Sequence, residues 1–346
     1  MIVRDAKAIA RQWVIEEAST IARFRGAFFH GGTTWLADDA VQPATSDLDV
    51  MLVLADPSPS VKLGKVRYRD VLLDVSDLPL DDVRSPDQVL ADYRLAGSFR
   101  VPTTILDPTG HLTALQVAVA AEYANRRWVI RRREHAEANI RRHLRSVRED
   151  DPFHDQVTGW LFGTGVTTHV LLVAGLENPT VRRRYEAARL LLTSHGHGDF
   201  YEFLLEQLGC AEMSRKTVET HLATMTEAFD AATAVVTTPF FFASDISDVA
   251  RPIAIAGSRE VIERGDHRAA IFWIVATYAR CRKVFVHDAP EGMRDAFDDG
   301  FRSLLADLGI VSFADLRARG EQVASSLPRV RAVADAIMAA NQRIDD

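Results

Sequence analysis

The chain has 346 residues, of which 47% are apolar and 26% are charged, and its formal net charge is −7. This composition is ordinary for a soluble globular protein, and the length suggests two domains. The negative net charge excludes a general electrostatic attraction to nucleic acid or to an anionic membrane. Because the two cysteines, Cys210 and Cys281, form no CxxC pair, the sequence indicates neither a zinc site nor a disulfide framework.

The N-terminal segment places Ile9, Trp13 and Ile21 at helical spacing, with charges between them. This pattern predicts an amphipathic helix rather than a signal peptide. The most apolar later segment, AAIFWIVATYARC at 269–281, has 13 residues, fewer than the roughly 20 that a membrane-spanning helix requires. We therefore expect a cytoplasmic protein with no membrane segment.

The first 110 residues combine short apolar runs with turn residues, which is typical of a compact α/β or α+β unit. Strands are expected at 27–30, 48–54 and 103–110, and two more on either side of Arg69-Asp70 within 65–79. Ser85 and Pro86 are suited to the start of a helix that runs to about Leu95.

After residue 110 the strand patterns nearly vanish and helical patterns follow one another. They cover 111–148, 153–175, 179–194, 199–208, 214–236, 266–287 and 312–340. The sequence therefore predicts an α+β protein. An N-terminal domain, 1–110, contains a mixed sheet with helices, and an all-α helical bundle domain, 111–346, follows it.

An acid pair stands at the start of the expected strand 48–54. In a strand, residues i and i+2 project to the same face, so Asp47 and Asp49 point the same way while Leu48 faces the core. Two carboxylates this close repel each other unless a cation lies between them. Hard oxygen ligands on a rigid strand suit Mg²⁺, which completes its coordination with water and phosphate oxygens.

A glycine-threonine turn precedes this acid pair. Gly31 and Gly32 follow an expected strand and allow the backbone to approach an anion closely, and Thr33 and Thr34 add hydroxyl donors. A phosphate-binding turn that faces a metal-binding acid pair is the layout for phosphoryl or nucleotidyl transfer.

A third acid lies on a later strand, where VLLDVS places Asp74 among apolar residues. An aspartate inside an apolar strand is unusual, and two-metal sites use a further acid to bind the second ion or to accept a proton. Asp77 is the alternative if the strand is shifted by one position.

Together, GGTT, a polar loop, SDLDVMLVL and an acid on a following strand resemble the nucleotidyltransferase superfamily that includes DNA polymerase β. The resemblance covers about residues 20–110. Its double glycine is similar to the small-molecule antibiotic nucleotidyltransferases and to the tRNA CCA-adding enzymes. The chain departs from the pattern at Thr33, where many members have serine. It also has Trp35-Leu36 where tRNA-directed members carry an arginine-aspartate pair.

The resemblance implies a polymerase-β-like fold and a role for each matched residue. Asp47 and Asp49 would bind Mg²⁺, with two ions expected, and Asp74 would be a metal ligand or the general base. The turn residues Gly31, Gly32, Thr33 and Thr34 would hold the triphosphate. Apart from the resemblance, Ser46, Lys62 and Lys65 are also assigned to the nucleotide, the two lysines because their loop could bring them to a phosphate. The alternative for the two lysines is a solvated position, because lysines in loops are commonly solvated.

The implied reaction is the Mg²⁺-dependent transfer of a nucleoside monophosphate from an NTP, with ATP as the default, to a hydroxyl of a small-molecule acceptor. Two alternatives remain. Nine arginines between Arg126 and Arg148 could direct the enzyme to RNA or to a protein, although a solvated face paired with acids is the favoured interpretation of this stripe. The third possibility is a non-catalytic, nucleotide-sensing protein.

Overall fold

The computed structural model describes residues 1–55 and 63–346. These residues form two compact units. The first unit comprises Met1–Arg132, Pro239–Ile253 and Arg343–Asp346, and the second comprises Arg133–Thr238 and Ala254–Gln342. The sequence-based division at residue 110 stays a prediction, and the first unit also includes two segments from much later in the chain.

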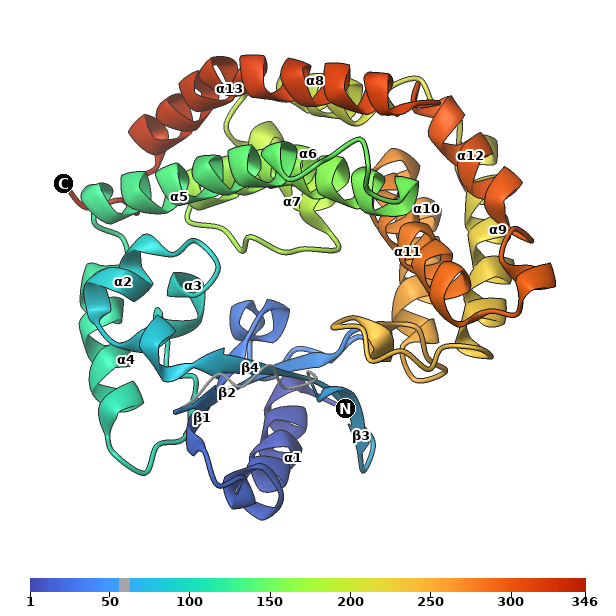
Figure 1. Ribbon diagram of the computed structural model, residues 1–346. Helices are drawn as coiled ribbons and strands as arrows, with labels where there is room; N and C mark the ends of the chain where they lie inside the picture. Colours follow the sequence, from blue (N-terminus) through green and yellow to red (C-terminus); the bar gives the residue numbers. More distant parts are fainter. Residues whose placement is uncertain (56–62) are drawn as a thin grey trace. The chain divides into compact units, whose positions relative to one another are not determined.

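Within the described residues, a five-stranded sheet forms the centre of the first unit (Figure 1). Its strands are β1 (Phe24–His30), β2 (Leu48–Leu54), β3 (Gly64–Tyr68), β4 (Val71–Pro79) and β5 (Thr104–Leu106). The spatial order is β3-β4-β2-β1-β5, and β2 and β4 are parallel while all other neighbours are antiparallel. This mixed sheet in the N-terminal part, together with the helices, confirms the α+β class.

One face of the sheet packs on helix α1 (Val3–Glu16). Alternate residues of β2, such as Leu48, Val50 and Leu52, are fully buried on this face because successive side chains of a strand point to opposite sides. They meet the apolar stripe of α1, in which Trp13 and Val14 are buried. This core holds β2 rigidly.

Helices of the first unit also pack on the opposite face of the sheet (Figure 1). Phe28, Val53 and Leu78 pack there with apolar residues of α2 (Pro86–Ala91), α3 (Ala96–Phe99) and α4 (His111–Glu122). Ser85 caps α2, as predicted, by accepting a hydrogen bond from the backbone N–H of Gln88. On this same face, at the beginning of β2, the side chains become polar.

The second unit is helical, and no residue in it belongs to a strand. Helix α5 (Arg126–Arg145) starts in the first unit and continues into the second. The remaining helices are α6 (Phe153–Ala174), α7 (Arg184–Ser194), α8 (Asp199–Leu208), α9 (Arg215–Thr233), α10 (Gly257–Glu263), α11 (His267–Asp288), α12 (Asp298–Asp307) and α13 (Phe313–Ala340). The pattern of the sequence predicted most of these but not α10 or α12.

Helix α6 is the central helix of the second unit and packs against α7, α8, α11 and α13. It is the one helix in the described residues that is long and apolar enough to cross a membrane, and 83% of its most apolar window is buried inside the structure. A core helix passes the same test of length and composition. The cytoplasmic location stays a prediction.

Candidate active site

Four strands of the sheet each bring one polar or charged residue to the same level. His30 on β1 is paired with Asp49 on β2. Asp49 is paired in turn with Asp74 on β4, and Asp74 with Lys65 on β3. Since paired residues of neighbouring strands project from the same face, these four side chains form a row across the sheet.

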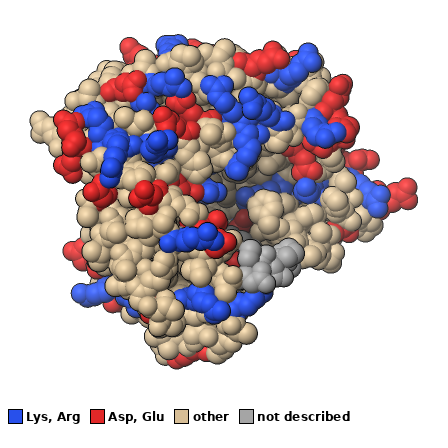
Figure 2. Space-filling view, turned by 60° about the vertical axis from the view of Figure 1, so that its left-hand side comes forward, with Lys and Arg blue, Asp and Glu red and all other residues tan. Residues whose placement is uncertain are grey.

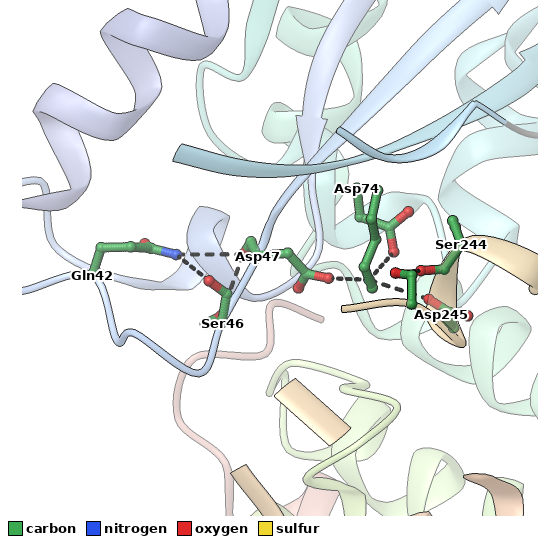
Figure 3. Close-up of polar contacts among 8 residues, drawn as sticks. Gln42, Ser46, Asp47, Asp74, Ser244 and Asp245 are labelled. Atoms are coloured by element: carbon green, nitrogen blue, oxygen red, sulfur yellow. Dashed lines mark hydrogen bonds and ion pairs between the residues drawn. The ribbon is translucent and has the colours of Figure 1, made fainter. Parts of the chain in front are cut away.

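Lys65 gathers three carboxylates around its ammonium group. Its Nζ lies 2.5 Å from Asp47 Oδ2 and 2.9 Å from Asp74 Oδ2. The third partner is Asp245, whose Oδ1 lies 3.2 Å away. Figure 3 shows the three aspartates pointing toward one another, with the dashed lines of these ion pairs converging between them. The Lys65 side chain is only 5% exposed, so this is a largely buried ionic cluster.

The pKa of Lys65 reflects two opposing effects. Burial lowers the pKa, since it disfavours the charged form, but the carboxylates of Asp47, Asp245 and Asp74 outweigh burial and raise the pKa above its usual value. Lys65 is therefore a permanent cation at physiological pH. The sequence assigned this lysine to a nucleotide phosphate, whereas in the structure it binds the acids.

Asp245 is a member of the cluster that the sequence did not indicate. It ends a short 3₁₀ helix, η4 (Ala243–Asp245), in the segment Pro239–Ile253 that belongs to the first unit. Phe242, 3% exposed, anchors this segment and stacks on Phe240 with 5.0 Å between ring centroids. Three consecutive phenylalanines before an aspartate were the only local signal, and they do not identify the partner of that aspartate.

Asp49 lies against the glycine-threonine turn. Gly31 has φ 62° and ψ −150°, a conformation that is essentially restricted to glycine. A β-carbon at Gly31 would come within 2.0 Å of Asp49 Oδ2, so the Asp49 carboxylate fills the space that a side chain would need. At Gly32 a β-carbon would meet nothing within 4 Å. The turn therefore lies directly beside Asp49, and its role in binding phosphate stays a prediction.

The two threonines shape the turn from within. Thr33 and Thr34 are buried, and their hydroxyls donate to the carbonyls of His30 and Gly31 at 3.5 Å and 2.8 Å. Their role as phosphate ligands stays a prediction.

Arg100 donates to the carbonyl of Thr34 at 2.9 Å, and its guanidinium carbon lies 3.7 Å from the centroid of the Trp35 ring. A positive charge thus supports the turn at its C-terminal end.

His30 completes the row at β1. Its Nδ1 is 2.7 Å from the hydroxyl of Ser98, and burial lowers the pKa of the ring to about 4. The imidazole is therefore neutral near pH 7. Its position beside Asp49 had no signature in the sequence, because a single histidine at the end of a strand is a common feature.

The remaining predicted residues are placed as follows. Ser46 directs its hydroxyl to the carbonyl of Asp47 at 3.3 Å, and Gln42 reaches the carbonyls of both residues (Figure 3). Lys62 lies outside the described residues. Asp77 is paired with Leu52 and therefore projects from the α1 face of the sheet, opposite to the face of Asp74. The register thus makes Asp74, and not Asp77, the neighbour of Asp49.

The donor chemistry of the cluster fits Mg²⁺, because Asp47, Asp49, Asp74 and Asp245 offer carboxylate oxygens on or beside one sheet face. As the side chains stand, the described residues contain no group of three His, Cys, Asp or Glu side chains arranged around a metal position. The geometry explains this, since Asp47 and Asp74 are turned to Lys65 and Asp49 is turned to Gly31. A metal ion would need oxygens that Lys65 now holds.

Four of the nine arginines between Arg126 and Arg148 are paired with acids. Arg126, Arg127, Arg133 and Arg148 form ion pairs with Asp346, Glu122, Asp335 and Asp150. A fifth, Arg132, is buried and donates to the carbonyls of Leu90 and Tyr123. Basic and acidic side chains are also interspersed on the face drawn in Figure 2. This arrangement agrees with a solvated face paired with acids.

Comparison with known proteins adds no assignment, since no protein-family model and no curated protein matches the sequence. The resemblance to the nucleotidyltransferase superfamily therefore stays a prediction. Any functional proposal depends on the arrangement of Gly31, Asp47, Asp49, Asp74 and Lys65.

Proposed function

We propose that this protein is a Mg²⁺-dependent nucleotidyltransferase whose first unit has a polymerase-β-like fold. It transfers a nucleoside monophosphate from an NTP, with ATP as the default, to a hydroxyl of a small-molecule acceptor and releases pyrophosphate. The observation that carries the proposal is the pairing of Asp49 with Asp74 on parallel neighbouring strands, directly beside the Gly31 turn.

The topology around this pair supports the proposal. A strand that ends in the glycine turn is antiparallel to the strand of the acid pair, which is parallel to the strand of the third acid. All three acids reach one end of one face, and the opposite face is anchored on α1. The sheet is rigid and presents its acids next to a turn in which Gly31 has a conformation that is essentially restricted to glycine. Such a site is suited to hold a triphosphate in a fixed orientation.

In the reaction, the acceptor oxygen forms a bond to the α-phosphorus of the NTP. The bond from that phosphorus to the oxygen that bridges to the β-phosphorus breaks, and pyrophosphate leaves with its electron pair. The acceptor proton passes to a carboxylate, for which Asp74 is the candidate. The Gly31 turn orients the triphosphate, and Arg100 keeps the turn in place.

Asp47 and Asp49 are the residues that would hold magnesium, with Asp74 as a ligand of a second ion if it is not the base. When bound, the metal neutralises phosphate charge and polarises the α-phosphorus. The chain's own contribution is to place the oxygen donors on a strand whose alternate residues are fully buried.

A small acceptor is favoured over nucleic acid by the state of the α5 arginines. Five of the nine arginines between residues 126 and 148 are engaged by acids or backbone carbonyls. Binding of a polyanion depends on phosphate contacts from available basic groups, so a stripe in which more than half of the arginines are already engaged is a poorer surface for it.

The test is a thermal-shift panel of the four NTPs, with and without Mg²⁺, on the wild type and on Asp49→Asn. We expect one NTP to raise the melting temperature of the wild type in the presence of Mg²⁺ only, because a ligand that binds the folded state stabilises it. Asp49→Asn should lose this shift. Asp77→Asn is the matched control, since it removes an acid from the opposite face of β4.

Pyrophosphate release then separates catalysis from binding. Release that grows with time when candidate hydroxyl acceptors are added, and that disappears in Asp49→Asn, supports transfer. A thermal shift without any pyrophosphate would instead indicate nucleotide sensing. Full activity in both Asp47→Asn and Asp49→Asn would rule out the proposed mechanism.

A further inference from the structure

Lys65 occupies the position where three acids of the site, Asp47, Asp74 and Asp245, converge. We infer that the Lys65 ammonium group and a divalent cation compete for the carboxylates of Asp47 and Asp74. When these two carboxylates bind the metal ion, Asp245 stays paired with the Lys65 ammonium group. This inference rests on the proposed Mg²⁺ requirement of the same site.

The first step of the argument is that both cations need the same atoms. Lys65 Nζ is in contact with Asp47 Oδ2 and Asp74 Oδ2 at 2.5 Å and 2.9 Å. Asp47 is a proposed metal ligand, and Asp74 is a proposed ligand or base. A divalent ion that took up these oxygens would lie beside an ammonium group, and the two positive charges repel each other.

The second step concerns the strength of this linkage. The Lys65 side chain is 5% exposed, and the side chains of Asp47 and Asp74 are 19% and 14% exposed. Electrostatic interactions are less screened in such a place than at the open surface. Binding of the metal ion and binding of the ammonium group are therefore thermodynamically coupled, and each weakens the other by the same factor.

The third step assigns the role of Asp245. Its contact with Lys65 Nζ is the longest of the three, and it comes from the segment Pro239–Ile253 rather than from the sheet. A lysine has a flexible four-carbon stem, so its ammonium group can shift between acids without movement of the strand. Asp245 can keep the buried ammonium group paired while Asp47 and Asp74 bind the metal ion. Asp245 is thus a positioning residue that acts through Lys65.

The test uses the metal ion alone, without nucleotide. Calorimetric titration with Mn²⁺ or Mg²⁺ should show about tenfold tighter binding to Lys65→Met than to the wild type, within the usual range of coupling between two sites. Lys7→Met is the matched control, since it removes a lysine of the same unit that pairs with a different acid, the exposed Asp38. It should leave the metal affinity unchanged.

A second variant isolates Asp245. In the wild-type background, Asp245→Asn should weaken metal binding, because Lys65 then depends more on Asp47 and Asp74. In the Lys65→Met background the same substitution should have little effect, since Asp245 acts through the lysine. An equal loss of affinity in both backgrounds would show that Asp245 is itself a metal ligand and would overturn its assigned role.

A measurement on the wild type does not depend on the folding of any variant. The chain contains five lysines, Lys7, Lys62, Lys65, Lys216 and Lys283, so isotope labelling of lysine side chains gives a simple NMR spectrum. The signal that disappears in Lys65→Arg identifies Lys65. Addition of Mg²⁺ should shift this signal while those of Lys7, Lys216 and Lys283 stay in place.

The inference is overturned if the Lys65 signal does not respond to Mg²⁺ or if Lys65→Met binds metal no more tightly than the wild type. Its failure is distinguishable from failure of the proposed function. A shift of the Lys65 signal by metal without pyrophosphate release from any NTP would contradict nucleotidyl transfer and leave the competition standing. Pyrophosphate release together with a Lys65 signal that does not respond to Mg²⁺ would contradict the competition and leave nucleotidyl transfer standing.

Discussion

Asp49 on β2 and Asp74 on β4 lie directly opposite each other in the parallel pair of strands at the centre of the sheet. Neighbouring strands are about 4.8 Å apart, so the two carboxylates project side by side from one face. Two acids at this separation require a cation nearby. Lys65 supplies one to Asp74, while Asp49 lies against the Gly31 turn.

The first prediction concerns Asp74. Asp74→Asn keeps the size of the side chain but removes a negative charge and the capacity to accept the acceptor proton. If Asp74 is the general base, we expect kcat for nucleotidyl transfer to fall by at least about a hundredfold, the lower range of what such a base contributes. Pyrophosphate release under saturating NTP measures this.

Asp77→Asn is the control for this prediction, because Asp77 lies on the same strand but on the α1 face. Its activity should remain close to that of the wild type. The far-UV circular dichroism of both variants should match the wild type. If Asp77→Asn loses activity and Asp74→Asn keeps it, the assignment from the strand register is wrong.

The second prediction compares two adjacent glycines. Gly31→Ala forces a side chain into a conformation restricted to glycine and within 2.0 Å of Asp49 Oδ2. We expect a loss of about 1–3 kcal/mol in the free energy of unfolding from the backbone strain alone. Gly32→Ala meets nothing within 4 Å and should be nearly neutral for stability. Urea unfolding followed by circular dichroism provides the comparison.

Nucleotide binding should respond differently to these two substitutions. Gly31→Ala displaces the Asp49 carboxylate and should abolish the thermal shift by NTP. Gly32→Ala leaves the turn intact. If NTP binding is weaker in this variant, the added methyl group occupies space that the bound phosphates need. Equal stability of the two variants would contradict the contact between Gly31 and Asp49.

Much of the first unit could be predicted from local patterns. The bounds of β2 agree with the predicted strand 48–54, and the reversal at Arg69-Asp70 separates β3 from β4 as expected. These features depend on alternation within a few residues. The sequence suggested that Asp49 and Asp74 lie in one site, but it could not establish that they pair directly across β2 and β4. The register of two parallel strands depends on the packing of both faces of the sheet.

The cluster around Lys65 could not be predicted from the sequence. Its contact with Asp245 joins β3 to a segment far along the chain, and no spacing rule connects the two. Lys65 itself follows a stretch of sequence rich in proline and serine, where lysines are commonly exposed, yet its side chain is buried by its partners. The short helices α10 and α12 were missed for a related reason, since tertiary packing stabilises short helices more than their own propensity does.

The third prediction tests the arginine stripe. Charge reversal of Arg141 and Arg142, both exposed on α5, should leave nucleotidyl transfer unchanged, and the wild type should bind a generic single-stranded RNA only weakly at physiological salt. Fluorescence anisotropy across a range of salt concentrations measures the binding. Tight RNA binding that falls steeply with salt and is lost in the charge-reversal variant would instead support an RNA-directed enzyme.

The last prediction concerns pH and His30. Because burial lowers the pKa of His30 to about 4, the folded protein keeps this ring neutral while the unfolded chain takes up a proton near the ordinary histidine pKa of about 6.5. The contribution of His30 to stability is therefore complete above pH 6.5. It decreases as the pH falls from about 6.5 to about 4, by roughly 1.4 kcal/mol for each pH unit.

His30→Asn isolates this contribution, since asparagine does not titrate and can still form a hydrogen bond with Ser98. Three other histidines, His143, His154 and His169, also have pKa values lowered by burial, but all three are present in the wild type and in the variant. Urea unfolding at pH 7 and pH 5 should show that the wild type loses more stability on acidification than His30→Asn does. Parallel losses in the two proteins would mean that His30 is accessible to protons in the folded state, and the site would then contain a titrating histidine beside Asp49.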